Sequence, residues 1–436
     1  MKGGVTVLVA AVCALAATPL AVADLPVPAQ PPPPPPVATP PPSPWQWTFD
    51  EDVRYFSWRA NIGYSHLSLF PGQPPRGPGS GSQIYVPMAL KVIGKPTPDW
   101  KVTFLVRSGY VSARQTTPGA SGEVSTTTDT MLNAKAAFLG WRGIQPFAAL
   151  SVNVPTGQSA LLGASAFARL DPDLVDLATY GEGLNVGPTG GVNIPLTDDL
   201  LVSAGGGYTY RGPYNREGAI DPVTLVQGLT HLKPGDQASA NAAIGYDNDR
   251  LAITLGGNYT IESTTFLDDQ AFYKTGDRRR ANLAVSYEWD KFWDSSATAN
   301  YSHYNRNSVA MLGIPGLVLE QFNSNATVYR VDFDTTYKSG PWSAGPVGGY
   351  LFRDRNSWNS DSFQFLPGKT RWLAGGVLGY KLTPQTAINS RFEYYWISEG
   401  ANPQKIVLGT RFRAPGYRPS AAPAGFCRLR RPSNGE

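Results

Sequence analysis

Residues 184–211, LNVGPTGGVNIPLTDDLLVSAGGGYTYR, alternate between two kinds of side chain. On either side of a turn at 195–199, every second position is apolar or aromatic. The positions between them are small or polar, from Asn185 to Arg211. Alternation over about ten residues on both sides of a polar turn is typical of a β-hairpin with one apolar and one polar face.

The same pattern recurs along the chain from Tyr55. It predicts sixteen strands, at 55–69, 82–94, 99–112, 127–142, 145–155, 183–195, 200–213, 236–247, 250–263, 279–290, 295–306, 325–338, 341–355, 369–382, 385–398 and 403–413. The connections alternate between short turns, such as 196–199 and 247–249, and long loops, such as 156–182 and 212–235. Short turns at one end and long loops at the other are the arrangement of an outer-membrane barrel.

The apolar faces of segments such as 100–106, 281–289 and 329–337 carry no Asp, Glu, Lys or Arg, although 16% of all residues are charged. A charge facing lipid at mid-depth costs about 2–4 kcal/mol, which explains such clean faces. Aromatic residues gather at both strand ends, as expected for two interfacial belts. We therefore predict an all-β fold, a transmembrane antiparallel β-barrel with sixteen strands, short periplasmic turns and long external loops.

The chain ends differ from the barrel in composition. Residues 1–23 have a basic start, an apolar run and a small-residue cleavage pattern, which predicts a signal peptide. Residues 24–50 are proline-rich and predict an extended periplasmic linker, with contact to peptidoglycan as the alternative role. The barrel is expected at 51–413, followed by a basic flexible tail at 414–436. Pro188 and Pro346 fall inside predicted strands, and we expect bulges there.

At the level of architecture, residues 55–413 resemble the general bacterial porins. The closing segment 405–412, KIVLGTRF, is similar to the porin closing strand, with Phe412 as the final aromatic residue. The resemblance implies the outer membrane of a Gram-negative bacterium, passive diffusion of small polar solutes, and a homotrimer. A second similarity, to putative outer-membrane transporters linked to phenol degradation, depends on residues 153–157, NVPTG, since Pro-Thr-Gly at a strand end looks like a signature of that group.

Basic residues predominate at the inward positions of the last four strands. The predicted pore-lining basic sector consists of Arg353, Arg371, Lys381, Arg391, Lys405, Arg411 and Arg413, with Glu393 among them. A basic wall in a low-dielectric barrel raises the local concentration of anions. The alternative is that these are solvated lumen residues balanced by acids of the loops.

The third loop, residues 156–183, is the candidate constriction. It carries Asp171, Asp173, Asp176 and Glu182, opposite in sign to the basic sector. In the porins that this chain resembles, the third loop folds into the pore, and such a loop would set acids against arginines across it. The alternative is a loop that stays at the outer surface.

Other functional classes find little support in the sequence. The three histidines, His66, His231 and His303, lie at strand ends or in a loop without a nucleophile and acid arranged around them, so no enzyme activity is expected. No His, Cys and Asp spacing predicts a metal, no cofactor is expected, and a net charge of +4 is too small to suggest nucleic acid. The basic sector favours an anion-preferring diffusion channel. The main alternative is a plugged barrel that transports hydrophobic or aromatic compounds.

Overall fold

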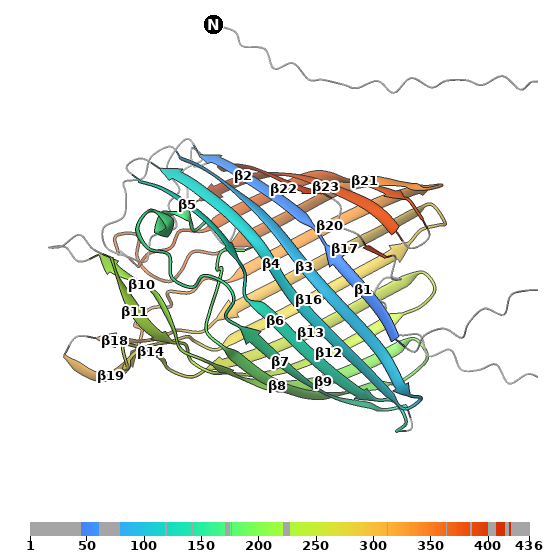
Figure 1. Cartoon of the computed structure of the whole chain (residues 1–436), viewed down its shortest axis with the longest axis horizontal. Coiled ribbons are helices and arrows are strands. Elements are labelled where there is room, and N and C mark those ends of the chain that lie inside the picture. Colours follow the sequence, from blue (N-terminus) through green and yellow to red (C-terminus); the bar gives the residue numbers. More distant parts are fainter. Residues whose placement is uncertain are drawn as a thin grey trace, which may run out of the picture. The chain divides into compact units, whose positions relative to one another are not determined.

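Antiparallel strands make up most of the described chain in the computed structural model (Figure 1). The structure describes residues 45–60, 79–117, 120–141, 143–170, 175, 177–220, 227–311, 313–362, 364–383, 386–399, 407–414 and 418–419. All of them belong to one compact unit, Pro44–Glu436. No helix among them is long and apolar enough to cross a membrane. The predicted signal peptide and most of the predicted linker and tail lie outside the described residues.

The principal strands pair antiparallel with their neighbours in chain order. They are β2 (Val53–Ala60), β3 (Gly79–Thr97), β4 (Trp100–Thr117), β6 (Thr130–Phe138), β7 (Gln145–Val154), β8 (Asn185–Pro195), β9 (Leu200–Arg211), β12 (Gln237–Asp247), β13 (Leu251–Glu262), β16 (Arg278–Glu288), β17 (Trp293–Tyr304), β20 (Val328–Ser339), β21 (Trp342–Arg353), β22 (Lys369–Lys381), β23 (Thr386–Glu399) and β24 (Val407–Ala414). β24 pairs with β2, and β2 pairs with β3, so the pairings lead back to the strand where they began. The hairpin at 184–211 is β8–β9, in the register that its alternation predicts.

Three further segments extend these strands. β1 (Trp45–Glu51) continues the line of β2 along β3, and β5 (Ala120–Thr127) continues the line of β6 along β4. β1 corrects the predicted linker boundary, because Trp45, Trp47 and Phe49 continue the alternation that we expected to begin later. β25 (Arg418–Pro419) pairs with the start of β23, so pairing reaches into the region predicted as a tail.

A second sheet is built from the long connections, which we expected to be long external loops. Its strands are β10 (Tyr214–Ile220), β11 (Gln227–Lys233), β14 (Thr265–Leu267), β15 (Gln270–Lys274), β18 (Ser308–Met311) and β19 (Ile314–Leu319). The β14–β15 turn places Asp268 and Asp269 at φ of 47° and 63°, the left-handed backbone that two-residue hairpins need.

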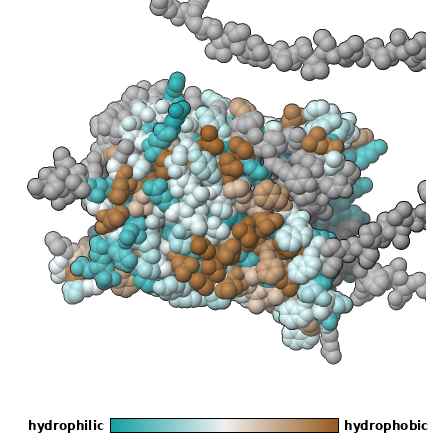
Figure 2. All heavy atoms as spheres, in the orientation of Figure 1, coloured by the Kyte–Doolittle hydropathy of each residue, from teal (hydrophilic) through white to brown (hydrophobic). Residues whose placement is uncertain are grey.

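The two faces of the principal sheet differ as the alternation predicts. We call outer the face that exposes large apolar side chains, such as Leu255 and Phe333, each 51% exposed. We call inner the opposite face, against which the described residues of the loop 156–183 pack at β3, β4 and β5. Along β4, the outer Tyr110 is 43% exposed and the adjacent inner Val111 is fully buried. Figure 2 shows hydrophobic side chains across this wall of strands, with hydrophilic ones gathered toward the end where β10 and β11 lie.

Aromatic pairs mark both ends of the outer face. Near the short turns, the ring centroids are 5.2 Å apart in Trp100–Phe138 and 4.5 Å apart in Trp342–Tyr380. Near the long connections, the Tyr350–Trp372 centroids are also 4.5 Å apart. This is the placement expected of interfacial belts on either side of a lipid-facing band.

The predicted bulges at the two strand prolines are wrong. The register of β8 with β9 is the same before and after Pro188, and that of β20 with β21 is the same around Pro346. Each proline still pairs on its other side, with Leu150 and Gly376 respectively. A residue in a strand directs its N–H toward only one neighbouring strand. A proline therefore removes one inter-strand hydrogen bond on that side and leaves the register unchanged.

A charge on the outer face should therefore be costly and one on the inner face tolerated. Phe333→Arg, in the middle of β20 on the outer face, should lower the free energy of unfolding in lipid vesicles by about 2–4 kcal/mol. Thr298→Arg, on the inner face opposite Asp332, should change it by less than about 1 kcal/mol. Urea titration of both variants measures the difference, and equal costs would contradict the assignment of faces.

Candidate functional site

The loop between β7 and β8 lies against the inner face. Its short 3-10 helix, η1 (Gly163–Ala168), packs on β4 and β5, with Ala166 and Ala168 buried against Val111, Ala113 and Val124. Leu161 and Leu170, on either side of η1, are 0% and 2% exposed. Most of the apolar side chains in the loop segment 161–170, LLGASAFARL, are thus buried on the inner side of the wall, although Leu162 is 43% exposed. Burial of this apolar surface stabilises the inner position of the loop.

One carboxylate holds both ends of this loop. Asp129, between β5 and β6, accepts a hydrogen bond from the backbone N–H of Gly157 at 2.9 Å and from that of Glu182 at 2.7 Å. The amide of Asn153, at the end of β7, donates a third at 2.7 Å. Hydrogen bonds to a charged acceptor are among the stronger ones in proteins, so Asp129 closes the loop at its base.

The base of the loop is too crowded for side chains. A Cβ added to Gly157 would lie 2.0 Å from the carbonyl oxygen of Tyr180, and one added to Gly181 would lie 2.7 Å from the carbonyl carbon of Gly157. Thr156 completes the junction, because its hydroxyl donates to the carbonyl of Thr128 at 2.9 Å. The Pro-Thr-Gly segment that we related to phenol-linked transporters therefore lies where the two ends of the loop contact each other closely.

An ion pair holds the far side of the loop. Arg169 donates from Nε to one carboxylate oxygen of Glu217 at 2.8 Å and from Nη2 to the other at 3.2 Å. Glu217 belongs to β10 in the second sheet, and it also accepts from the backbone N–H of Leu161 at 3.1 Å. Burial alone would raise the pKa of the Glu217 carboxyl, but the hydrogen bond and charge of Arg169 outweigh it and hold that pKa below its ordinary value.

The last part of the loop contacts β3. The amide of Gln83, which is 2% exposed, donates to the carbonyl of Leu177 at 2.8 Å. Tyr180 is 1% exposed and donates to the carbonyl of Ala168 at 3.3 Å. Burial raises the pKa of the Tyr180 phenol to about 12. This side chain is therefore a neutral hydrogen-bond donor at neutral pH.

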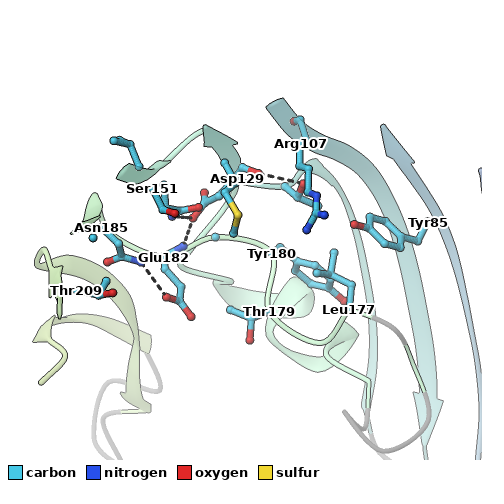
Figure 3. A pocket seen from close by; sticks show the side chains of 17 residues that line it. Tyr85, Arg107, Asp129, Ser151, Leu177, Thr179, Tyr180, Glu182, Asn185 and Thr209 are labelled. Carbon is cyan, nitrogen blue, oxygen red and sulfur yellow. Dashed lines mark hydrogen bonds between the residues drawn. The ribbon is translucent and has the colours of Figure 1, made fainter. Parts of the chain in front are cut away.

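A cavity of about 520 Å³ lies between this part of the loop and the wall. Its lining includes apolar and aromatic side chains together with amides and hydroxyls: Tyr85, Met131, Leu177, Tyr180, Ser108, Ser151, Asn153, Asn185 and Thr209. Arg107 reaches the same cavity from β4, directed toward the loop segment that carries Tyr180 (Figure 3). Within the described chain, Arg107 forms no hydrogen bond or ion pair, so its guanidinium is available to a solute anion.

Only one of the four predicted constriction acids can be placed. Asp171, Asp173 and Asp176 lie outside the described residues. Glu182 lines the cavity, 3.6 Å from the guanidinium of Arg211 and 3.4 Å from the amide of Asn185. Its carboxylate is therefore already engaged by groups of the neighbouring wall.

The structure describes the side chains of four of the seven residues of the predicted basic sector. Arg353 and Arg371 are buried on the inner face, with Arg371 over the ring of Tyr395 at 5.1 Å. Arg391 pairs with Glu393, which also accepts the Tyr395 hydroxyl. Lys381 is exposed at the end of β22. Lys405 lies outside the described residues, and register alone places Arg411 opposite Glu393 and Arg413 opposite Arg391.

Sequence reasoning missed the basic residues at the other end of the chain. By register, Lys91, Lys101, Arg107 and Lys135 also occupy the inner face, on β3, β4 and β6. It also missed Asp129, whose role depends on backbone groups 28 and 53 residues further along the chain. An acid directly after the threonines at 126–128, within a predicted strand, was the available signal, since an unpaired carboxylate is out of place there.

The described histidines have ordinary structural contacts. The Nδ1 atom of His231 lies 3.1 Å from Oδ1 of Asn215, and that of His303 lies 2.9 Å from Oγ1 of Thr327. His66 lies outside the described residues. Across the described ranges, no three His, Cys, Asp or Glu side chains are grouped so as to hold a metal.

Comparison with known proteins gives similarity of architecture at low identity. No family model and no curated protein matches the chain. Among solved structures, the COG4313 outer membrane channel from Pseudomonas putida F1 is similar, with 12% identity, 61% of this chain and 92% of that chain covered, and a TM-score of 0.38. Pseudomonas aeruginosa OpdQ aligns with 9% identity, 86% and 99% coverage and a TM-score of 0.40.

A mutant of the Rh. blastica porin aligns with 12% identity, 85% and 99% coverage and a TM-score of 0.32. Two of these three solved structures are named as an outer membrane channel and a porin. At these identities and TM-scores, the chain is similar to them without being assigned to a family.

Removing the charge of Asp129 should free the base of the loop. Asp129→Asn loses at least one of three hydrogen bonds to a charged acceptor, worth roughly 2 kcal/mol. Amide hydrogen exchange in peptides from 156–183 should then accelerate by about 30-fold. The matched control is Asp198→Asn, in the exposed turn between β8 and β9, which should leave this exchange unchanged. Unaltered exchange in Asp129→Asn would show that the carboxylate does not anchor the loop.

The Arg169–Glu217 pair should make the loop sensitive to acid. Because the pKa of Glu217 is lowered in the folded state, its contribution is complete above the ordinary carboxyl pKa of about 4.3 and is lost as the pH falls through the lowered value. Hydrogen exchange of 156–183, corrected for intrinsic rates, should rise relative to the rest of the chain between pH 5 and pH 3. Glu217→Gln should show fast exchange already at pH 7 and no such rise.

Proposed function

We propose that this protein is an outer-membrane channel of a Gram-negative bacterium, built as a closed barrel of sixteen strands, for the passive diffusion of small polar solutes. The returning ladder of strand pairs, the apolar outer face and the aromatic pairs at its two ends support the barrel. The observation that carries the function is the loop 156–183, held on the inner face by Asp129 and by the Arg169–Glu217 pair. A loop held at both its base and its far side can act as a fixed constriction in the path of a solute, without moving as a gate.

We further propose that the channel prefers anions. Arg107 lies at the cavity beside the loop without a partner in the described chain, and other basic residues occupy the inner face from β21 around to β6. Acids balance part of this charge, as in the pairs Arg391–Glu393 and Arg330–Asp332. Arg107 is therefore the residue on which anion preference should depend most.

The packing of the loop also bears on the main alternative, a plugged transporter of hydrophobic compounds. Such a transporter needs apolar side chains that face a solute path. Here Leu161, Leu170 and Tyr180 are at most 2% exposed and contact the wall or each other. Their apolar surface is used in packing, which favours the polar channel. The homotrimer and the contact of residues 24–50 with peptidoglycan stay predictions.

The experiment is single-channel recording of the refolded mature chain in a planar bilayer under a salt gradient. A steady conductance of nanosiemens scale, with a reversal potential that shows anion preference, is expected. Silence from a chain shown to be folded would favour the plugged barrel. Deleting residues 171–176 should raise the conductance, and an unchanged conductance would count against loop 156–183 as the constriction.

Charge reversal at Arg107 should change selectivity with little effect on folding. One unit charge about 7 Å from a passing ion, in a water-like dielectric, stabilises an anion by roughly 0.6 kcal/mol and destabilises a cation by the same amount, a difference of about 1.2 kcal/mol or about sevenfold in their permeability ratio. Arg107→Gln should therefore lower the anion-to-cation permeability ratio about sevenfold, and Arg107→Glu should lower it further. Arg250→Gln, in the exposed turn between β12 and β13, is the control. If Arg107→Gln and Arg250→Gln lower the permeability ratio equally, the selectivity does not come from the cavity.

A further inference from the structure

The wall formed by β3, β4 and β5 continues beyond the apolar band of the outer face. Outer positions change from apolar to polar along these strands: Ile84 and Tyr110 are large and exposed, whereas Ser82, Ser80 and Thr116 follow further along. A polar outer surface has no reason to lie in hydrocarbon. On the proposed orientation, this part of the wall stands in the headgroup layer and above it, on the side of the long loops.

Two arginines project from this polar part of the outer face. Arg59, near the end of β2, is in register with Ser80, and Arg114 of β4 is in register with Ser82. The two arginines are thus separated by one strand, which places their strands about 10 Å apart, within the combined reach of two long side chains. A depression of about 490 Å³ lies between them. Its lining includes Tyr55, Ser57, Arg59, Ser80, Arg114 and Tyr394.

The described residues leave much of the charge of these arginines uncompensated. Arg59 forms no hydrogen bond or ion pair within the part of the chain that the structure describes. Arg114 donates from Nε to the hydroxyl of Ser82 at 3.1 Å, which leaves its other N–H groups for a ligand. Glu123 of β5 is in register with Arg114, but the two form no ion pair in the described chain. The depression therefore combines two guanidinium groups with serine hydroxyls, a set of donors suited to phosphate oxygens.

The depth of the depression identifies the source of the phosphate. Each arginine lies four residues beyond an outer-face tyrosine of its own strand, Tyr55 on β2 and Tyr110 on β4. Four residues of a tilted strand rise about 10 Å along the membrane normal. Interfacial aromatic residues sit at headgroup level, so groups about 10 Å further out meet the polar part of the lipid rather than its chains.

We propose that Arg59 and Arg114 form a binding site for a phosphate group of a lipid headgroup in the external leaflet. The site depends on the proposed membrane orientation but not on conduction, because it lies on the opposite face of the wall from loop 156–183. Glu123 tempers the site by repulsion. Lipid would thus be held at a defined place on the wall next to the junction of the first and last strands, β2 and β24.

The test is lipid retention by the full mature chain, refolded in micelles that contain diphosphoryl lipid A and analysed by native mass spectrometry. An arginine near a membrane surface contributes about a factor of five in affinity for an anionic lipid. Arg59→Gln and Arg114→Gln should each weaken retention about fivefold, and the double variant about 30-fold. Glu123→Gln should strengthen it. Heat-dependent mobility in gels verifies that each variant is folded.

Controls separate phosphate recognition from simpler explanations. Arg279, exposed on the outer face of β16, also lies toward the long loops, but register sets it opposite Tyr259 and His303 rather than serines. Arg279→Gln should leave retention unchanged. An equal loss in this variant would mean general charge attraction and would overturn the site. Lipid A without phosphates should bind at least about 10-fold more weakly than the diphosphoryl form, and equal binding would refute phosphate recognition.

Two further readouts complete the design. Inorganic phosphate at a concentration equal to that of lipid phosphate should not displace the lipid; displacement would reassign the depression to free phosphate. Single-channel conductance of the Arg59→Gln, Arg114→Gln double variant should equal that of the wild type. A folded chain that retains lipid A but never conducts would contradict the proposed channel and leave the lipid site standing.

Discussion

The structure around the proposed path depends on the carboxylate of Asp129. Asp129 lies between the end of β5 and the start of β6. Its carboxylate accepts hydrogen bonds from both ends of the 28-residue loop 156–183. If only the flanking strands held its ends, a loop of this length would lose much conformational entropy on adopting a single conformation. With both ends tied to one charged acceptor, its apolar face can pack on the inner wall, and the cavity beside Arg107 acquires a defined lining.

The wall itself was predictable because strand alternation is a local property. A charge facing lipid is costly, so residues 184–211, 329–337 and their counterparts show the period in the sequence. Within the described residues, the predicted strands overlap those of the principal ladder. The start was misjudged because the prolines before Trp45 concealed that the alternation had already begun. The prolines at 188 and 346 were misjudged because a missing N–H affects only one side of a strand.

The candidate site was less predictable because its contacts are long-range. Nothing near Asp129 in the sequence announces that it will meet Gly157 and Glu182, and nothing near Glu217 announces Arg169. The second sheet escaped notice for the same reason: its short strands pair between successive long connections, as β11 does with β14. The alternation of each strand shows which charged residues face inward, but it does not show which of them form ion pairs. Arg391 pairs with Glu393, whereas Arg107 has no ion-pair partner in the described chain.

The central claim is that loop 156–183 lies in the path of solutes, and thiol modification of one open channel tests it most directly. Thr179→Cys, with Cys427→Ser to remove the other thiol of the mature chain, places a reactive group on an exposed loop position at the cavity. Asp269→Cys, in the β14–β15 turn, is the control. The account predicts a stepwise fall in current when a charged thiol reagent reacts at position 179 and none at 269. An unchanged current after verified modification at 179 would contradict it.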